Sequence, residues 1–62
     1  MKVKIKTYNG ELPSYLTSEK EYEVIWQYGH GVVDVIADNK ITTTIDINDC
    51  YHLDGGSWEI VE

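Results

Sequence analysis

Cys50 and His52 are the side chains best suited to catalysis or metal binding, and they lie two residues apart between Asp49 and Asp54. A structural zinc site needs four ligands, usually in two pairs, whereas this chain adds only the distant His30. A cysteine nucleophile needs a base within hydrogen-bond reach and a group that stabilises the oxyanion, and no other motif supplies one. We therefore predict no metal ligands and no catalytic residues, with Cys50 half-buried in a turn and His52 exposed.

The length of 62 residues corresponds to one domain, residues 1–62. A chain of this size buries only about 60% of the surface that it exposes when unfolded. Most of its large apolar side chains are then needed for the core, and few remain to line a catalytic cleft. The sequence therefore predicts a protein that is not an enzyme and binds no cofactor.

The cellular compartment is predicted from features that the sequence lacks. Its single cysteine cannot form an intrachain disulfide. The first ten residues alternate lysine with apolar residues and do not form the apolar segment of a signal peptide. No run approaches the roughly 20 apolar residues of a membrane-spanning helix. We expect a cytoplasmic protein that does not contact a membrane.

Charge is distributed unevenly along the chain, which has eleven acidic residues, five lysines and no arginine. Residues 1–20 carry a net charge of +2, whereas in residues 21–62 only Lys40 opposes nine acids, a net charge of −8. Phosphate backbones are bound by Lys and Arg, so direct nucleic-acid binding is not expected. The asymmetry favours a basic protein partner, although acidity can also serve solubility alone.

Apolar and polar side chains alternate over most of the chain, which is the period of β-strands. The alternation predicts five strands, at residues 2–6, 21–27, 32–37, 41–47 and 58–61. Asn9-Gly10 begins a long packed loop that ends at Lys20. We expect an all-β fold, a small five-stranded antiparallel barrel. The barrel is expected to close because an open sheet would expose one apolar face to water.

Turn residues separate these strands. Gly29-His30-Gly31 predicts a hairpin, and Asp38-Asn39 predicts a turn because both residues tolerate left-handed backbone angles. A short helical turn within residues 48–53 can be capped by Asn48 or Asp49, and Gly55-Gly56 follows it. Helix content should be minimal.

The two tryptophans are the largest side chains in the sequence. Trp58 is predicted to fix the last strand in the core. Trp26 alternates with Tyr22 and Val24, which favours a core position for it too. Because Trp26 lies at the end of its strand beside Tyr28, an exposed aromatic anchor for a partner stays an alternative.

Three segments, LTSEKEYEVIWQYG, VVDVIADN and CYHLDGGSWEIVE, together resemble small SH3-like proteins encoded by bacteriophages and prophages. Those proteins often show a Leu-x-x-x-Lys-x-Tyr-x-Val entry, a strand ending in Asp-Asn or Asp-Gly, and a terminal Trp-Glu-x-Val. The similarity covers roughly residues 16–62 and implies an SH3-like barrel, a viral protein and a location in the host cytoplasm. It implies architecture more than activity. The motifs with which signalling SH3 domains bind proline-rich peptides are not present, so that activity is not carried over.

The acidic side chains Glu21, Glu23, Asp34 and Asp46 are predicted to form one exposed face. Alternate residues of a strand lie ~6.7 Å apart, whereas duplex DNA carries one charge per ~1.7 Å of its axis. Full imitation of DNA is not expected. A partial imitation that competes for a basic groove stays an alternative to a merely solvated face.

The sequence thus predicts a small acidic protein-binding module, a phage accessory protein that docks on or inhibits a host protein, including a basic one that handles nucleic acid. The predicted partner-binding residues are Tyr15, Glu21, Glu23, Trp26, Tyr28, His30, Asp34 and Asp46. The alternative is a structural or assembly subunit that forms homo-oligomers through the edges of its first, fourth or last strand. Lys2, Lys4 and Lys6 would then protect the first edge.

Overall fold

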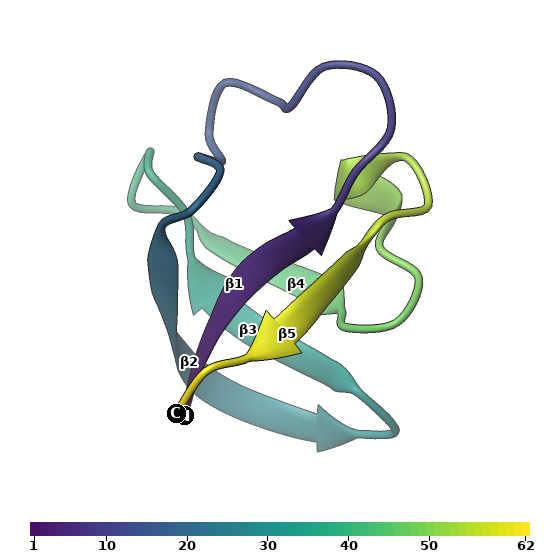
Figure 1. Cartoon of the computed structure of the whole chain (residues 1–62). Coiled ribbons are helices and arrows are strands. Elements are labelled where there is room, and N and C mark those ends of the chain that lie inside the picture. Colours follow the sequence, from purple (N-terminus) through teal and green to yellow (C-terminus); the bar gives the residue numbers. More distant parts are fainter.

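The computed structural model describes all residues, 1–62, and contains five strands and one short helix (Figure 1). The elements are β1 (Lys2–Thr7), β2 (Glu21–Gly29), β3 (Val32–Ile36), β4 (Thr42–Asp46), the 3-10 helix η1 (Tyr51–Leu53) and β5 (Ser57–Ile60). All strand pairs are antiparallel and form one sheet in the order β4-β3-β2-β1-β5. This confirms the predicted all-β class, the number of strands and the helical turn before the last strand.

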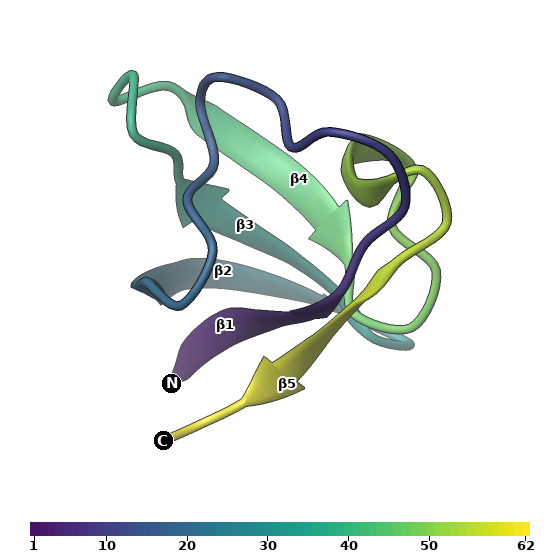
Figure 2. The same ribbon diagram turned by 45° about the horizontal axis from the view of Figure 1, so that its top comes forward.

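The sheet bends along β2, which is the longest strand and belongs to both halves. Its first residues pair with β1, with Glu21 opposite Lys4, and its later residues pair with β3, with Val24 opposite Val35. Figures 1 and 2 show β1 and β5 forming one half, with β3 and β4 in the other. The core lies between the two halves.

The edges of the sheet are β4 and β5, and no ladder joins them. One backbone hydrogen bond connects the two sides, from the Trp58 N–H to the Ile47 carbonyl at 2.8 Å, just beyond β4. The sheet is therefore open, and closure into a barrel stays a prediction.

β1 lies between β2 and β5, so the expectation that β1 is an edge protected by lysines was wrong. Lys2 and Lys4 instead lie near Glu62 and Glu59.

The core contains eleven buried hydrophobic residues from every strand and from three of the connections between strands. They are Val3, Ile5, Leu16, Tyr22, Val33, Val35, Ala37, Ile45, Cys50, Leu53 and Trp58. Trp58 is only 3% exposed, as predicted, and meets the ring of Tyr22 edge to face at 5.8 Å between ring centroids. Cys50 is fully buried, so the half-buried position predicted for it was wrong.

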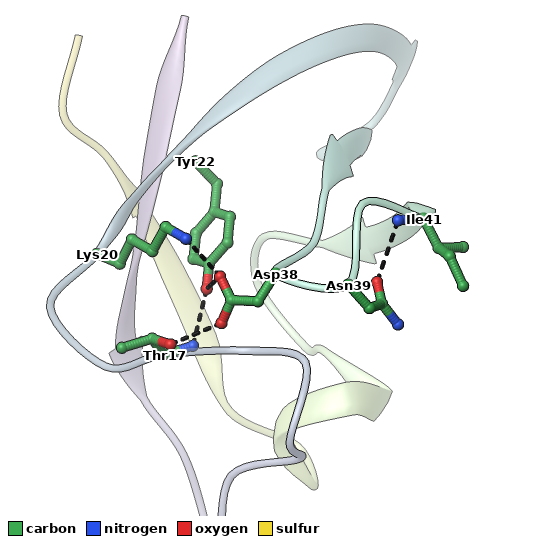
Figure 3. A network of polar contacts seen from close by, with 6 residues as sticks. All are labelled: Thr17, Lys20, Tyr22, Asp38, Asn39 and Ile41. Carbon is green, nitrogen blue, oxygen red and sulfur yellow. Dashed lines mark hydrogen bonds and ion pairs between the residues drawn. The ribbon is translucent and has the colours of Figure 1, made fainter.

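Two of the tight turns depend on left-handed backbone angles. In the β2–β3 hairpin, His30 and Gly31 both have positive φ, 56° and 80°, as a type I′ turn requires. In the β3–β4 turn the left-handed residue is Lys40, at φ 66°, and not Asp38 or Asn39 as predicted. The side chains of both predicted residues form hydrogen bonds around this turn: Asp38 binds the long loop, and the Asn39 Oδ1 accepts the Ile41 N–H at 3.1 Å (Figure 3).

The segment from β4 to β5 differs in detail from the prediction. The residue before η1 is Cys50, and no side chain caps the helix. Asn48 and Asp49 instead donate their backbone N–H groups to the Oδ1 of Asp46, at 2.9 and 3.2 Å.

Gly56, which follows η1, lies against β1: a Cβ at Gly56 would lie 2.1 Å from the Thr7 carbonyl oxygen. Only glycine fits there, because the backbones of β1 and β5 converge at this point.

The long loop between β1 and β2, residues 8–20, is anchored at both ends (Figure 2). At its start the Asn9 N–H donates to the Leu53 carbonyl at 3.1 Å. Near its end, the Asp38 N–H donates to the Tyr15 carbonyl at 2.9 Å, and Leu16 is buried in the core. The loop is therefore packed, as predicted.

The only helix of the chain, η1, has three residues, which is far too short to span a membrane.

Candidate functional site

Cys50 and His52 have different surroundings, since Cys50 is fully buried and the His52 ring is bonded to two other elements. His52 is half-buried, not exposed as predicted, and its Nε2 lies 3.2 Å from the Thr44 carbonyl, which can only accept. With the ring neutral, Nε2 carries the proton and Nδ1 accepts the Tyr15 hydroxyl at 2.7 Å. His52 thus connects the long loop, η1 and β4. No group of three or more His, Cys, Asp or Glu side chains is placed to hold a metal ion.

A polar cluster that we call the Asp38 clasp holds the end of the long loop against the β3–β4 turn (Figure 3). The Asp38 carboxylate accepts hydrogen bonds from Thr17 Oγ1 at 2.6 Å, Lys20 Nζ at 2.5 Å and the Tyr22 hydroxyl at 3.0 Å. The Thr17 N–H donates to the Tyr22 hydroxyl at 2.7 Å. Hydrogen bonds from Lys20 and Thr17 lower the pKa of Asp38, the bond with Asp38 raises the pKa of Lys20, and burial raises the pKa of Tyr22. Because Thr17, Lys20 and Tyr22 all bond to Asp38, the clasp ties the long loop and β2 to the β3–β4 turn.

Trp26 projects from the outer face of β2, and 62% of it is exposed. The core position predicted from alternation with Tyr22 and Val24 was wrong. The physical reason is a bulge: Val24 pairs with Val35, but Trp26 pairs with Asp34, so one residue of β2, Ile25, is extra. An extra residue reverses the side to which the following side chains point. Trp26 therefore faces outward.

Asp34 forms the centre of a row that crosses three strands on this outer face. Its Cα partners are Trp26 on β2 and Thr44 on β4, and residues paired in this way point to the same side of a sheet. The Tyr28 hydroxyl donates to Asp34 Oδ2 at 2.7 Å, and Thr44 Oγ1 donates to Oδ1 at 2.5 Å. Asp34 is only 8% exposed. The prediction that it belongs to a solvated acidic face was wrong.

The exposed side chains around this row form what we call the β2 patch: Ile25, Trp26 and Tyr28. Tyr28 is 57% exposed, and the hydrogen bond to Asp34 raises its pKa. The one hollow on the surface of the molecule is lined by the adjoining residues of the bulge, Val24 to Gln27. Adjacent exposed aromatic residues beside a hollow are typical of an interaction surface.

Of the predicted partner-binding residues, the structure brings together Trp26, Tyr28 and Asp34. Glu21 and Glu23 are exposed at the start of the same strand, and Glu23 lies 3.5 Å from the Met1 amino group. The other three lie apart from the β2 patch: Tyr15 is bonded to His52, His30 is exposed at the hairpin tip, and Asp46 organises the turn after β4. The four predicted acids therefore do not form one exposed face.

Sequence reasoning missed Ile25, Thr44 and Tyr51, which is 92% exposed on η1. The signal for Thr44 was the polar Asp34 in an otherwise apolar strand, since a carboxylate there needs hydroxyl donors from its neighbours. Ile25 had no such signal, because its exposure follows from the bulge. Nothing in the sequence distinguishes Tyr51 from the tyrosines that pack. Comparison of the chain with protein-family models, with curated proteins and with solved structures finds no match.

Proposed function

We propose that this chain is a non-enzymatic protein-binding module that docks on a basic protein through the β2 patch. The observation that carries the proposal is the exposure of Trp26 and Tyr28, side by side on one face, in a chain whose core has only eleven hydrophobic residues. Exposed aromatic side chains of this size are the anchors that dominate many interfaces. The hollow at the bulge, lined by Val24 to Gln27, adds a concave surface beside these rings.

The charge of the surrounding chain supports a basic partner. The patch belongs to the segment 21–62, where nine acids oppose Lys40 alone, and the whole chain has a net charge of −6. Such a surface attracts a basic protein and repels nucleic acid, so the docking should weaken as salt screens the charges.

The proposal includes an SH3-like architecture and a phage or prophage origin. The strand order, the long loop after β1 and η1 before β5 support the first part. The sequence resemblance over residues 16–62 supports the second. In that case the partner is a host protein in the host cytoplasm, and docking on it can inhibit it.

The test is capture from a bacterial lysate with wild-type protein, Trp26→Ala and the matched control Tyr51→Ala, which removes an even more exposed aromatic side chain from η1. The proposal expects that wild type and Tyr51→Ala capture the same basic protein at low salt and release it at high salt, and that Trp26→Ala does not capture it. Equal capture by Trp26→Ala would contradict docking through the β2 patch.

A second candidate function, an assembly subunit, is favoured by the two free edge strands, β4 and β5. Ile60 on β5 and Ile41 before β4 are both exposed beside these edges. Strand edges can pair with the edge of another copy. Light scattering decides: a stable oligomer supports assembly, and a 7.1 kDa monomer at all concentrations contradicts it.

A further inference from the structure

We infer that Trp26, Tyr28 and Asp34 form a recognition site for an arginine side chain that the protein partner presents. The inference rests on the proposed docking function and names the chemistry that the β2 patch recognises. It is carried by a buried carboxylate that has no positive charge beside it and by two exposed aromatic rings on the same face.

Asp34 is the only charged side chain among the buried residues, and none of the four ion pairs includes it. Its only hydrogen-bond donors are two neutral hydroxyls, those of Tyr28 and Thr44. A buried carboxylate without a countercharge is unfavourable, because the lost hydration is only partly replaced. A cation that arrives with a partner would relieve this cost.

The chain itself shows what is missing at Asp34. The Asp38 clasp has the same components, a tyrosine hydroxyl from Tyr22 and a threonine hydroxyl from Thr17, and adds the ammonium of Lys20. Asp34 has the tyrosine and the threonine but no lysine. None of the five lysines forms an ion pair with Asp34.

Arginine fits the open position better than lysine. A carboxylate offers about four acceptor positions, and Tyr28 and Thr44 occupy one on each oxygen of Asp34. The planar guanidinium can donate to both oxygens at once and can also stack on an aromatic ring. The ammonium of lysine can also approach a ring, as Lys20 does over Tyr22 at 5.3 Å from the ring centroid, but it is a compact charge without a planar pair of donors that matches the two oxygens.

The rings of Trp26 and Tyr28 provide the stacking surface. Both are mostly exposed, and both belong to the face that carries Asp34. A cation within about 6 Å of an aromatic ring centroid is attracted by the electrons of its face, most strongly with tryptophan. Because the Tyr28 hydroxyl donates to a carboxylate, electron density on its ring is increased, which strengthens this attraction.

The experiment is an NMR titration of the full chain with N-acetyl-arginine amide, observed at the Trp26 indole N–H and the Tyr28 ring. The control probe is N-acetyl-citrulline amide, which has the same shape without the charge. The variants are Asp34→Asn, Trp26→Ala and the control Glu21→Gln, which removes one charge from an exposed position of β2. Dispersion of the amide signals verifies that each variant is folded.

The inference expects saturable shifts with the arginine probe and none with the citrulline probe. Asp34→Asn and Trp26→Ala should each weaken binding about tenfold or more, whereas Glu21→Gln should change it less than about twofold. Equal shifts with both probes, or wild-type affinity in Asp34→Asn, would overturn it. If a lysine probe binds as tightly as arginine, the bidentate geometry is wrong.

The lysate capture tests the docking function, and the NMR titration tests the arginine site, so the two results can differ. Partner capture that is lost in Trp26→Ala but retained in Asp34→Asn would support docking through the β2 patch and would reject the arginine site.

Discussion

Two regions of this small protein are built from the same four residue types and reach opposite outcomes. At the Asp38 clasp, an aspartate, a tyrosine and a threonine are joined by Lys20, and the neighbouring tryptophan, Trp58, is buried against Tyr22. On the outer face of β2 and β3, an aspartate, a tyrosine and a threonine have no cation, and the neighbouring tryptophan, Trp26, faces solvent.

The difference shows how a short chain separates stability from interaction. At the clasp, the Asp38 carboxylate is bonded to an ammonium and two hydroxyls of the same molecule, and these bonds hold a loop in place. The outer-face row has a carboxylate with unused acceptor positions and exposed rings, so it can gain only from another molecule. Similar residues therefore serve folding in one place and recognition in the other.

The largest expected contrast is between the two tryptophans. Trp58→Ala should lower the free energy of unfolding by about 3–5 kcal/mol, which approaches the roughly 3–5 kcal/mol that a core of this size supplies. Trp26→Ala should change it by less than about 0.5 kcal/mol, since the side chain is mostly exposed. Urea unfolding followed by circular dichroism measures both. A Trp26→Ala variant as unstable as Trp58→Ala would mean that the outer face belongs to the core.

A smaller contrast is expected between the two tyrosine hydroxyls. Tyr22→Phe removes an acceptor of the Thr17 N–H and a donor to Asp38, and it should destabilise the fold by about 1–2 kcal/mol. Tyr28→Phe should destabilise the fold less. Asp34 keeps the hydrogen bond from Thr44, and the side chain at position 28 is mostly exposed to water. Thermal unfolding compares the two, with Tyr51→Phe as a control without a hydroxyl partner in the chain. Equal losses would remove the distinction between the regions.

The smallest effect is a pH dependence of stability, which on the acidic side comes from Asp38 in the clasp. The folded-state pKa of Asp38 lies below the ordinary 3.8, so acid protonates the unfolded chain first. Its contribution to stability is therefore complete above pH 3.8 and is lost as the pH falls through the lowered pKa. Lys20 has a raised pKa, so its contribution is complete below pH 10.5 and is lost as the pH rises through that raised value.

Melting temperatures of wild type and Asp38→Asn across the acidic range test this dependence. The two proteins should differ at neutral pH and converge below about pH 3.8. A difference that persists unchanged in acid would show that Asp38 acts only as a turn residue.

The fold class followed from local patterns, but the candidate site did not. Val3 and Ile5 alternate with lysines, and the β-branched run around Ile45 could hardly form anything but a strand, so the strands were predictable. Strand order was not predictable, because pairing of β1 with β5 joins residues 50 or more positions apart. That is why β1 was mistaken for an edge.

The position of Trp26 depends on a single extra residue at Ile25, which an alternation pattern cannot reveal. The bulge follows from the sharing of β2 between two halves of a bent sheet, which is a property of the whole fold. The partners of Asp34 and Asp38 likewise come from other strands or from the long loop. Residue types alone could therefore not show that Asp38 has a cation beside it and that Asp34 has none.

The two chain ends lie side by side (Figure 2). The Lys2 N–H donates to the Glu62 carbonyl at 3.0 Å, and the Val61 N–H donates to the Lys2 carbonyl at 2.9 Å. A peptide linker of a few residues could therefore join the two ends into a cyclic chain without moving a strand. Such a cyclic version would have fewer unfolded conformations to adopt, and it could be reopened at the His30-Gly31 tip to give a rearranged chain with the same outer face.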